Sequence, residues 1–156
     1  MFDSDFVAFH LPMHTATRLA VPVIRRGRAL VPRARLCGYG LYAELNGPLL
    51  RGLGVEHILG GEFEQALVEL VCGAVGVAGG SSDKGGQPRL RFRVPDRTGL
   101  PALERYASLQ MPSGERRVVG YTEASRGCKH HCRHCPVVPI YKGQFRVVPQ
   151  EVVLAD

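Results

Sequence analysis

Three closely spaced cysteines lie in the last third of the sequence. They are Cys128, Cys132 and Cys135, in a Cys-x3-Cys-x2-Cys pattern. Three thiolates from one loop can hold an iron–sulfur cube by three of its irons, which leaves the fourth iron open for chemistry. The spacing therefore predicts a cluster with one reactive position.

Zinc is the competing metal for this loop. A structural zinc site needs four closed ligands, and His130, His131 or His134 could complete a Cys3His set. Zinc modules usually bring two ligand pairs separated by a long spacer, whereas every candidate here lies in one loop. We therefore expect a cluster and keep a zinc-stabilised Cys3His binding module with a basic face as the alternative.

The composition predicts a soluble globular protein. The 156 residues are 45% hydrophobic and 22% charged, with no apolar run near the length of a membrane span and no secretory signal at the start. We expect a cytoplasmic protein whose thiols stay reduced. The remaining cysteines, Cys37 and Cys72, are expected to be small buried side chains without a role.

The net charge of +6 invites a nucleic-acid interpretation. However, the arginines are spread along the chain, and few aromatic residues that could stack on bases lie between them. We therefore expect neither specific nucleic-acid binding nor membrane association. An acidic small molecule or a cofactor tail would explain the charge equally well.

Strands and helices alternate in the first half of the chain. Apolar runs predict strands over 5–11, 35–42 and 55–59, and helical periodicity predicts helices over 16–30, 45–53 and 63–74, with Pro22 implying a late start or a kink in the first helix. Such alternation predicts a doubly wound parallel sheet that binds ligands at the carboxyl ends of its strands. Three strands are too few to complete such a sheet.

The second half begins with a linker. Residues 78–88 are rich in Gly and Ser, which is typical of a flexible connection between domains. Beyond it we predict a short helical turn within 101–109 and a strand over 117–123 that leads into the cysteine loop.

The cysteine loop closely resembles the signature loop of the radical S-adenosylmethionine (radical SAM) enzymes. The similarity covers Ser125 to Pro136 after a strand, with His134 where that family carries an aromatic residue beside the adenine. The resemblance implies that each cysteine ligates one iron of a [4Fe–4S] cluster. It also implies that S-adenosylmethionine chelates the fourth iron and is cleaved reductively to a 5′-deoxyadenosyl radical.

The upstream strands resemble part of the cobalamin-binding domain of class B, B12-dependent radical SAM proteins. The matching segments are 5–9, 34–40 and 55–64, which look like the third, fourth and fifth strand segments of that domain. The resemblance implies cofactor contacts at Gly60, Gly61 and Glu62, and cobalamin-dependent methyl transfer as a further hypothesis. Phe63 departs from the family's Gly-Glu-Gly-Glu pattern. The absence of Asp-x-His-x-x-Gly argues against a histidine-ligated cobalt.

These resemblances define the expected organisation. Residues 1–76 are predicted to form a partial, Rossmann-like cobalamin-binding domain, 77–115 a linker region, and 116–156 the first strand-helix unit of a radical SAM (β/α) barrel, whose helix would lie over 149–156. Both domains would be incomplete, so we expect a fragment without full activity and assign no catalytic residue. A flavodoxin or a ferredoxin is the expected electron donor, and the substrate is undetermined.

Basic residues flank the predicted cluster. Lys129, Arg133 and Arg126 would place positive charge near an anionic cluster, and Arg146 could reach the cofactor from beyond the loop. Solvated surface cations are the alternative interpretation for this set.

Overall fold

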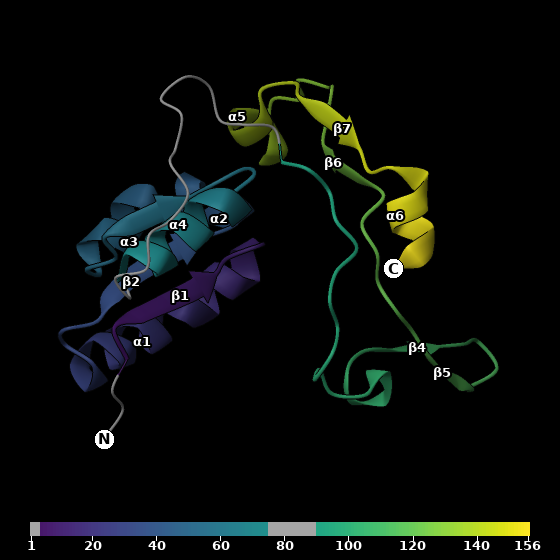
Figure 1. Ribbon diagram of the computed structural model, residues 1–156, viewed down its shortest axis with the longest axis horizontal. Helices are drawn as coiled ribbons and strands as arrows, with labels where there is room; N and C mark the ends of the chain where they lie inside the picture. The colour runs from purple at the N-terminus through teal and green to yellow at the C-terminus, as the bar shows by residue number, and fades with distance from the viewer. Residues whose placement is uncertain (1–3, 75–89) are drawn as a thin grey trace. The chain divides into compact units, whose positions relative to one another are not determined.

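The computed structural model describes residues 4–74 and 90–156 (Figure 1). These residues divide into two units, 4–74 and 90 with 127–144, and 91–126 with 145–156. In chain order the elements are β1 (Phe6–His10), α1 (His14–Leu30), β2 (Arg35–Tyr39), α2 (Leu41–Leu45), α3 (Gly47–Gly52), β3 (His57–Leu59), α4 (Glu64–Ala74), the 3₁₀ turn η1 (Leu103–Arg105), β4 (Ser108–Gln110), β5 (Arg116–Val118), β6 (Ser125–Gly127), α5 (Val137–Tyr141), β7 (Phe145–Val147) and α6 (Gln150–Ala155).

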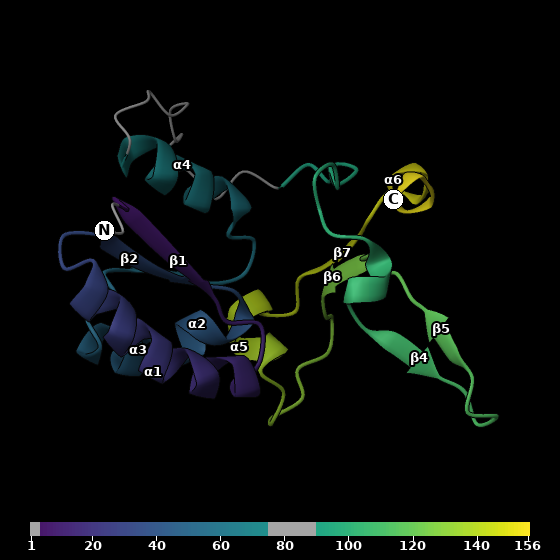
Figure 2. The ribbon, with the colours of Figure 1, turned by 90° about the horizontal axis from the view of Figure 1, so that it is seen from below.

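The first unit contains a three-stranded parallel sheet in the order β1-β2-β3. Phe6 lies opposite Arg35, and Cys37 lies opposite His57. Each strand is joined to the next by helix, as parallel neighbours require. Figure 2 shows α4 on one side of the sheet and α1 and α3 on the other. The predicted α/β alternation in this region therefore forms a mixed α/β unit with a parallel sheet.

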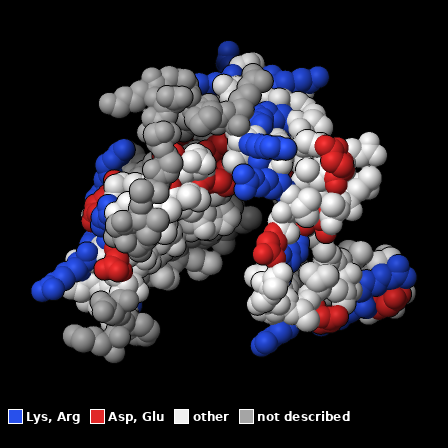
Figure 3. All heavy atoms as spheres, in the orientation of Figure 1, with Lys and Arg blue, Asp and Glu red and all other residues white. Residues whose placement is uncertain are grey.

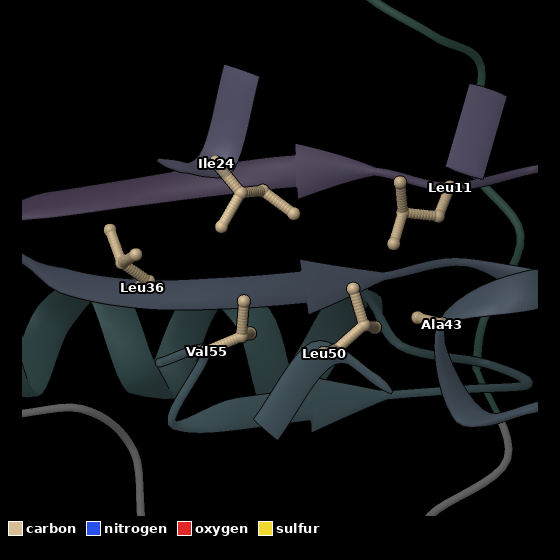
Figure 4. Packing of buried hydrophobic residues seen from close by; sticks show 6 residues of the cluster. All are labelled: Leu11, Ile24, Leu36, Ala43, Leu50 and Val55. Carbon is tan, nitrogen blue, oxygen red and sulfur yellow. The ribbon is translucent and has the colours of Figure 1, made fainter. Parts of the chain in front are cut away.

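The core of this unit lies on the face of β2 that is turned toward α1 and α3. Figure 4 shows its six buried side chains gathered beside that strand. They are Leu11, Ile24, Leu36, Ala43, Leu50 and Val55. A Cβ at Gly38 would lie 3.2 Å from Leu50, so the glycine leaves space for close packing against β2.

The predicted helix over 16–30 forms, with a different start and a different buried face. It begins at His14 and contains Pro22 in its interior, so Pro22 does not delay its start. Of its predicted apolar stripe, Ile24 is fully buried, but Leu19 is 67% exposed. The apolar pattern therefore includes residues, such as Leu19, that the sheet does not cover.

The second predicted strand, 35–42, is too long. It ends at Tyr39 because Gly40 adopts a φ of 104°, and α2 begins at the next residue. The predicted helix over 45–53 forms as α3, and the short helix α2, which was not predicted, precedes it and meets it at Asn46. Gly54 then follows α3 with a φ of 82°, a left-handed conformation that is typical of a glycine just after a helix.

The second unit contains an antiparallel hairpin of β4 and β5, with Ser108 opposite Val118. The predicted strand over 117–123 is therefore wrong in its extent, because its first residues pair with β4 and the chain leaves the sheet after Val118. A separate strand, β6, leads into the cysteine loop. The helical turn η1 and helix α6 lie within the segments predicted for them, whereas the linker prediction over 78–88 lies outside the described residues.

The C-terminal residue is fixed within the second unit. Arg97 donates to both carboxylate oxygens of Asp156, at 2.6 and 2.8 Å, and to the carbonyl of Tyr121 at 3.2 Å. The side chain of Asp156 is 5% exposed. This bidentate ion pair joins the end of α6 to the segment before β4.

The surface carries charges of both signs. In Figure 3, Lys and Arg occupy several parts of the visible face and are interspersed with Asp and Glu. Among residues 4–74 and 90–156, no helix has the length and apolar character needed to cross a bilayer.

Adjacent leucines on α3 test the core. Leu50 is fully buried and Leu49 is 47% exposed. We expect Leu50→Ala to lower the free energy of unfolding by about 2–5 kcal/mol through lost burial and a cavity. Leu49→Ala, the matched control, should change it by less than about 0.5 kcal/mol. Urea unfolding followed by circular dichroism measures both, and equal effects would contradict this core.

Candidate functional site

The cysteine loop runs from the end of β6 to the start of α5. The Cys128 N–H donates to the carbonyl of Gln144 at 3.1 Å, and the Cys135 N–H donates to the carbonyl of Cys132 at 3.3 Å. The first bond joins the entrance of the loop to the chain just before β7. The second closes a turn inside it. The backbone is thus fixed at its entrance, and one turn sets the relation of the last two cysteines.

Gly127 makes the entrance of the loop possible. It has a φ of 78°, which side-chain-bearing residues rarely adopt, and a Cβ there would collide with the carbonyl oxygen of Gln144. The same Cβ would lie 3.0 Å from the ring of Tyr141. Because Gly127 has no side chain, Gln144 and Tyr141 can pack closely against its backbone.

The three thiols of the loop are reduced and accessible. Cys132 is exposed, and Cys128 and Cys135 are half-buried. Within the described ranges, no group of three or more His, Cys, Asp or Glu side chains converges closely enough to hold a metal ion. The donor set fits an iron–sulfur cluster in its chemistry, since three thiols share one short loop. The loop would have to draw the sulfurs together on binding.

The loop histidines are exposed. His134 lies in the turn between Cys132 and Cys135, and His130 is open to solvent. His131 is exposed too, but its imidazole lies against the α-carbon of Gly143, since a Cβ there would be 2.7 Å from its Nε2. The predicted cofactor residue His134 is therefore accessible and is not packed into a core.

The cysteine loop belongs to the same unit as the parallel sheet. Residues 127–144 group with the first part of the chain, and α5 packs beside α2. Ile140 of α5 lies against Gly61, where a Cβ would be 3.7 Å from the isoleucine side chain. The exit of the loop is thus packed at the carboxyl end of β3.

A cavity of about 450 Å³ lies at this end of β3. Its polar side chains are Glu44, Arg51 and Lys142, and Phe63 supplies an aromatic wall. The remaining lining residues are Gly47, Ile58, Leu59, Gly60, Gly61, Ala66 and Ile140. The volume is within the range of small-molecule sites, and the carboxyl ends of parallel strands are where α/β folds bind ligands.

Two of the three residues predicted to contact cobalamin line this cavity. Gly60 and Gly61 do so, and the side chain of Glu44 lies so close to Gly60 that any Cβ there would collide with its carboxylate. Glu62 is not among the lining residues, and its carboxylate accepts a hydrogen bond from the Leu90 N–H at 3.0 Å. The predicted group of three is thus divided between two environments.

Sequence reasoning missed the charged residues of the cavity. Glu44 lies on α2, which was not predicted, Arg51 lies on α3, and Lys142 follows α5. Lys142 has a φ of 50°, a left-handed conformation that costs a non-glycine residue about 1–2 kcal/mol. The Lys-Gly pair after an apolar run was the available signal, because it is typical of a helix end with a left-handed residue.

Three aromatic rings meet beside this cavity. His10 stacks on Tyr39 with ring centroids 4.9 Å apart, and Tyr39 contacts Phe63 at 4.9 Å. The rings come from the ends of β1 and β2 and from the segment after β3. Partial burial lowers the pKa of His10 by desolvation, which favours a neutral imidazole.

Arg126 and Arg146, which precede and follow the loop in the sequence, belong to the second unit and contact other side chains there. Arg126 donates to both carboxylate oxygens of Glu123, at 3.2 and 2.7 Å, and its guanidinium lies 5.5 Å from the ring centroid of Phe92. Arg146 lies over the same ring at 4.6 Å. Arg126 is therefore a partnered side chain, in contrast to the exposed Lys129 and Arg133.

The strands on either side of the loop run antiparallel. β6 and β7 form a two-stranded sheet, and the Val148 N–H donates to the carbonyl of Ala124 at 3.0 Å. Since Cys128 bonds to Gln144 at the other end, the chain after the loop returns along β6. This return strand was not predicted from the sequence.

Comparison of this chain with protein-family models, with curated proteins and with solved structures found no match.

Gly127→Ala tests the entrance of the loop. The substitution introduces a Cβ at a positive φ and against Gln144, so it should break the Cys128 N–H bond and destabilise the loop by more than about 1 kcal/mol. We expect faster amide hydrogen exchange at Cys128. Gly120→Ala is the matched control, because nothing lies within 4 Å of its Cβ position. Unchanged exchange in Gly127→Ala would refute the tight closure.

Cys37 gives a second test, because it is fully buried whereas Cys72 is only half-buried. Burial raises the pKa of the Cys37 thiol to about 11. At pH 8, iodoacetamide should label Cys132 and leave Cys37 of the folded protein unmodified, and urea should expose both. The unfolded chain loses this proton at lower pH, so the resulting stabilisation should disappear as the pH rises toward 11. Rapid native labelling of Cys37 would contradict its burial.

Proposed function

We propose that this chain binds a [4Fe–4S] cluster through Cys128, Cys132 and Cys135 and presents it to S-adenosylmethionine, as a protein of the radical SAM type. The observation that carries the proposal is the set of three reduced, accessible thiols in one short loop whose entrance is fixed by a backbone hydrogen bond. Three thiolates are the donor set for a cluster with one open iron. When bound, such a cluster supplies the electron that cleaves the sulfonium reductively.

The residues of the chain would position the cofactors. The hydrogen bond from Cys128 to Gln144 fixes the first ligand at the end of β6, and the bond from Cys135 to Cys132 holds the other two across one turn. His134 lies exposed in that turn, where its ring can contact the adenine of S-adenosylmethionine. The exposed cations Lys129 and Arg133 would offset the negative charge of the thiolates.

A cobalamin at the carboxyl end of the sheet is the extension of this proposal. Gly60 and Gly61 line the cavity there, and their missing side chains leave room for the Glu44 carboxylate and for Ile140 beside it. Glu62, which accepts a bond from Leu90, supports this extension less. With a corrinoid present, we propose methyl transfer to an unactivated carbon, and a flavodoxin or ferredoxin as electron donor in the reducing cytoplasm.

Anaerobic reconstitution with iron and sulfide tests the cluster. We expect a brown protein with about four irons per chain, and a paramagnetic signal on reduction that changes when S-adenosylmethionine is added. The triple variant Cys128→Ala, Cys132→Ala, Cys135→Ala should bind no cluster. Cys72→Ala is the matched control outside the loop and should load normally.

Two results would overturn the proposal. One is stoichiometric zinc in place of iron after expression with both metals, which would favour the Cys3His alternative. The other is equal iron loading in the triple variant. Formation of 5′-deoxyadenosine by the reduced, loaded protein would establish the cleavage, and hydroxocobalamin titration would test the corrinoid extension separately.

A further inference from the structure

The cavity at the end of β3 is bordered by charged side chains that have no charged or hydrogen-bonding partner among the described residues. Within the described part of the chain, Arg51, Lys142 and Glu44 make no ion pair or side-chain hydrogen bond. Two cations and one carboxylate thus border a cavity of about 450 Å³. Charged groups that line a concave site without internal partners are available to a ligand.

The backbone conformation at Lys142 is a second observation that favours a ligand site at this cavity. Its φ is 50°, and among the described residues no other non-glycine residue has a positive φ. Glycine would adopt this conformation without strain, and Gly143 follows immediately. A strained residue whose side chain borders a cavity is a recognised sign of function. The strain at this position places a long basic side chain at the cavity.

The remaining lining residues define the kind of ligand. Phe63 offers an aromatic wall on which a planar ring can stack, and the Glu44 carboxylate can accept hydrogen bonds from hydroxyl groups. The missing side chain of Gly60 leaves room for the Glu44 carboxylate, which packs against its α-carbon. The cavity therefore offers Phe63 to an aromatic base, Glu44 to the hydroxyls of a sugar, and Arg51 with Lys142 to a phosphate.

We propose that this cavity binds a free nucleotide, as the alternative to the corrinoid extension above, with its phosphates between Arg51 and Lys142 and its ribose hydroxyls at Glu44. The site is assembled from α2, α3, the end of β3 and the residue after α5. It does not rest on the cluster, since no cysteine lines the cavity. The ligand would therefore be held at the same edge of the sheet whether or not the loop carries iron.

Isothermal titration with ADP tests this site. We expect saturable binding to the wild-type chain, and binding weaker by about tenfold or more for adenosine, which lacks the charge-assisted phosphate contacts. Arg51→Ala combined with Lys142→Ala should lose at least as much. Arg25→Ala with Arg26→Ala removes the same charge from exposed positions on α1 and should bind ADP as the wild type does.

Further variants separate lost binding from lost folding. Lys142→Gly removes the cation and relieves the backbone, so it should be at least as stable as the wild type and still bind ADP weakly. Lys142→Arg should restore binding. The triple cysteine variant should bind ADP normally, which makes failure of the cluster proposal distinguishable from failure here. The inference would be overturned if adenosine bound as tightly as ADP, or if the Arg51 and Lys142 double variant bound ADP as tightly as the wild type. Binding of hydroxocobalamin by a chain that does not bind ADP would overturn it too.

Discussion

A small set of backbone hydrogen bonds around Gly40 ties the carboxyl ends of the three parallel strands together. The Gly40 N–H donates to the carbonyl of Leu59 at 3.0 Å, the Leu11 N–H to that of Tyr39 at 2.7 Å, and the Tyr42 N–H to that of Leu11 at 2.9 Å. Gly40 makes them possible with a φ of 104°, and a Cβ there would lie 3.1 Å from the Leu11 oxygen. Because β2 stops there, α2 begins at once and carries Glu44 to the edge of the sheet. The cavity therefore depends on this turn.

The same edge also receives the exit of the cysteine loop. Ile140 lies against Gly61, and Lys142 lines the cavity, so the short helix α5 belongs both to the loop and to the wall of the cavity. Gly127 closes the other end of the segment against Gln144. Two features that are distant in sequence, the glycine pair after β3 and the three cysteines, are thus joined within one structural unit through five residues of helix.

Hydrophobic periodicity predicted much of the first unit because its signal is local. The alternation of apolar runs and helical stripes gives β1, α1, β2 and α4, and their parallel pairing follows from the helical connections. The errors lie where a single backbone angle decides, as at Gly40, or where pairing is non-local, as for β5 with β4 and for β7 with β6. The site shows the same division. The cysteines were predicted from their spacing and the glycine pair from a family resemblance, whereas Glu44, Arg51 and Lys142 become neighbours only through the packing of α2, α3 and α5.

The two candidate sites differ in how much of their geometry exists before a ligand binds. The cavity charges already border a defined volume, so binding there would need little rearrangement, and most of the interaction energy would remain available for affinity. The three thiols, by contrast, share a loop without converging as a metal-holding group within the described residues. Metal affinity at such a loop includes the cost of ordering it, and the bonds formed offset that cost. Ligand binding at the loop is therefore coupled to the conformation of the loop. Because α5 connects the loop to the end of β3, a change in the order of the loop would reach that end through α5.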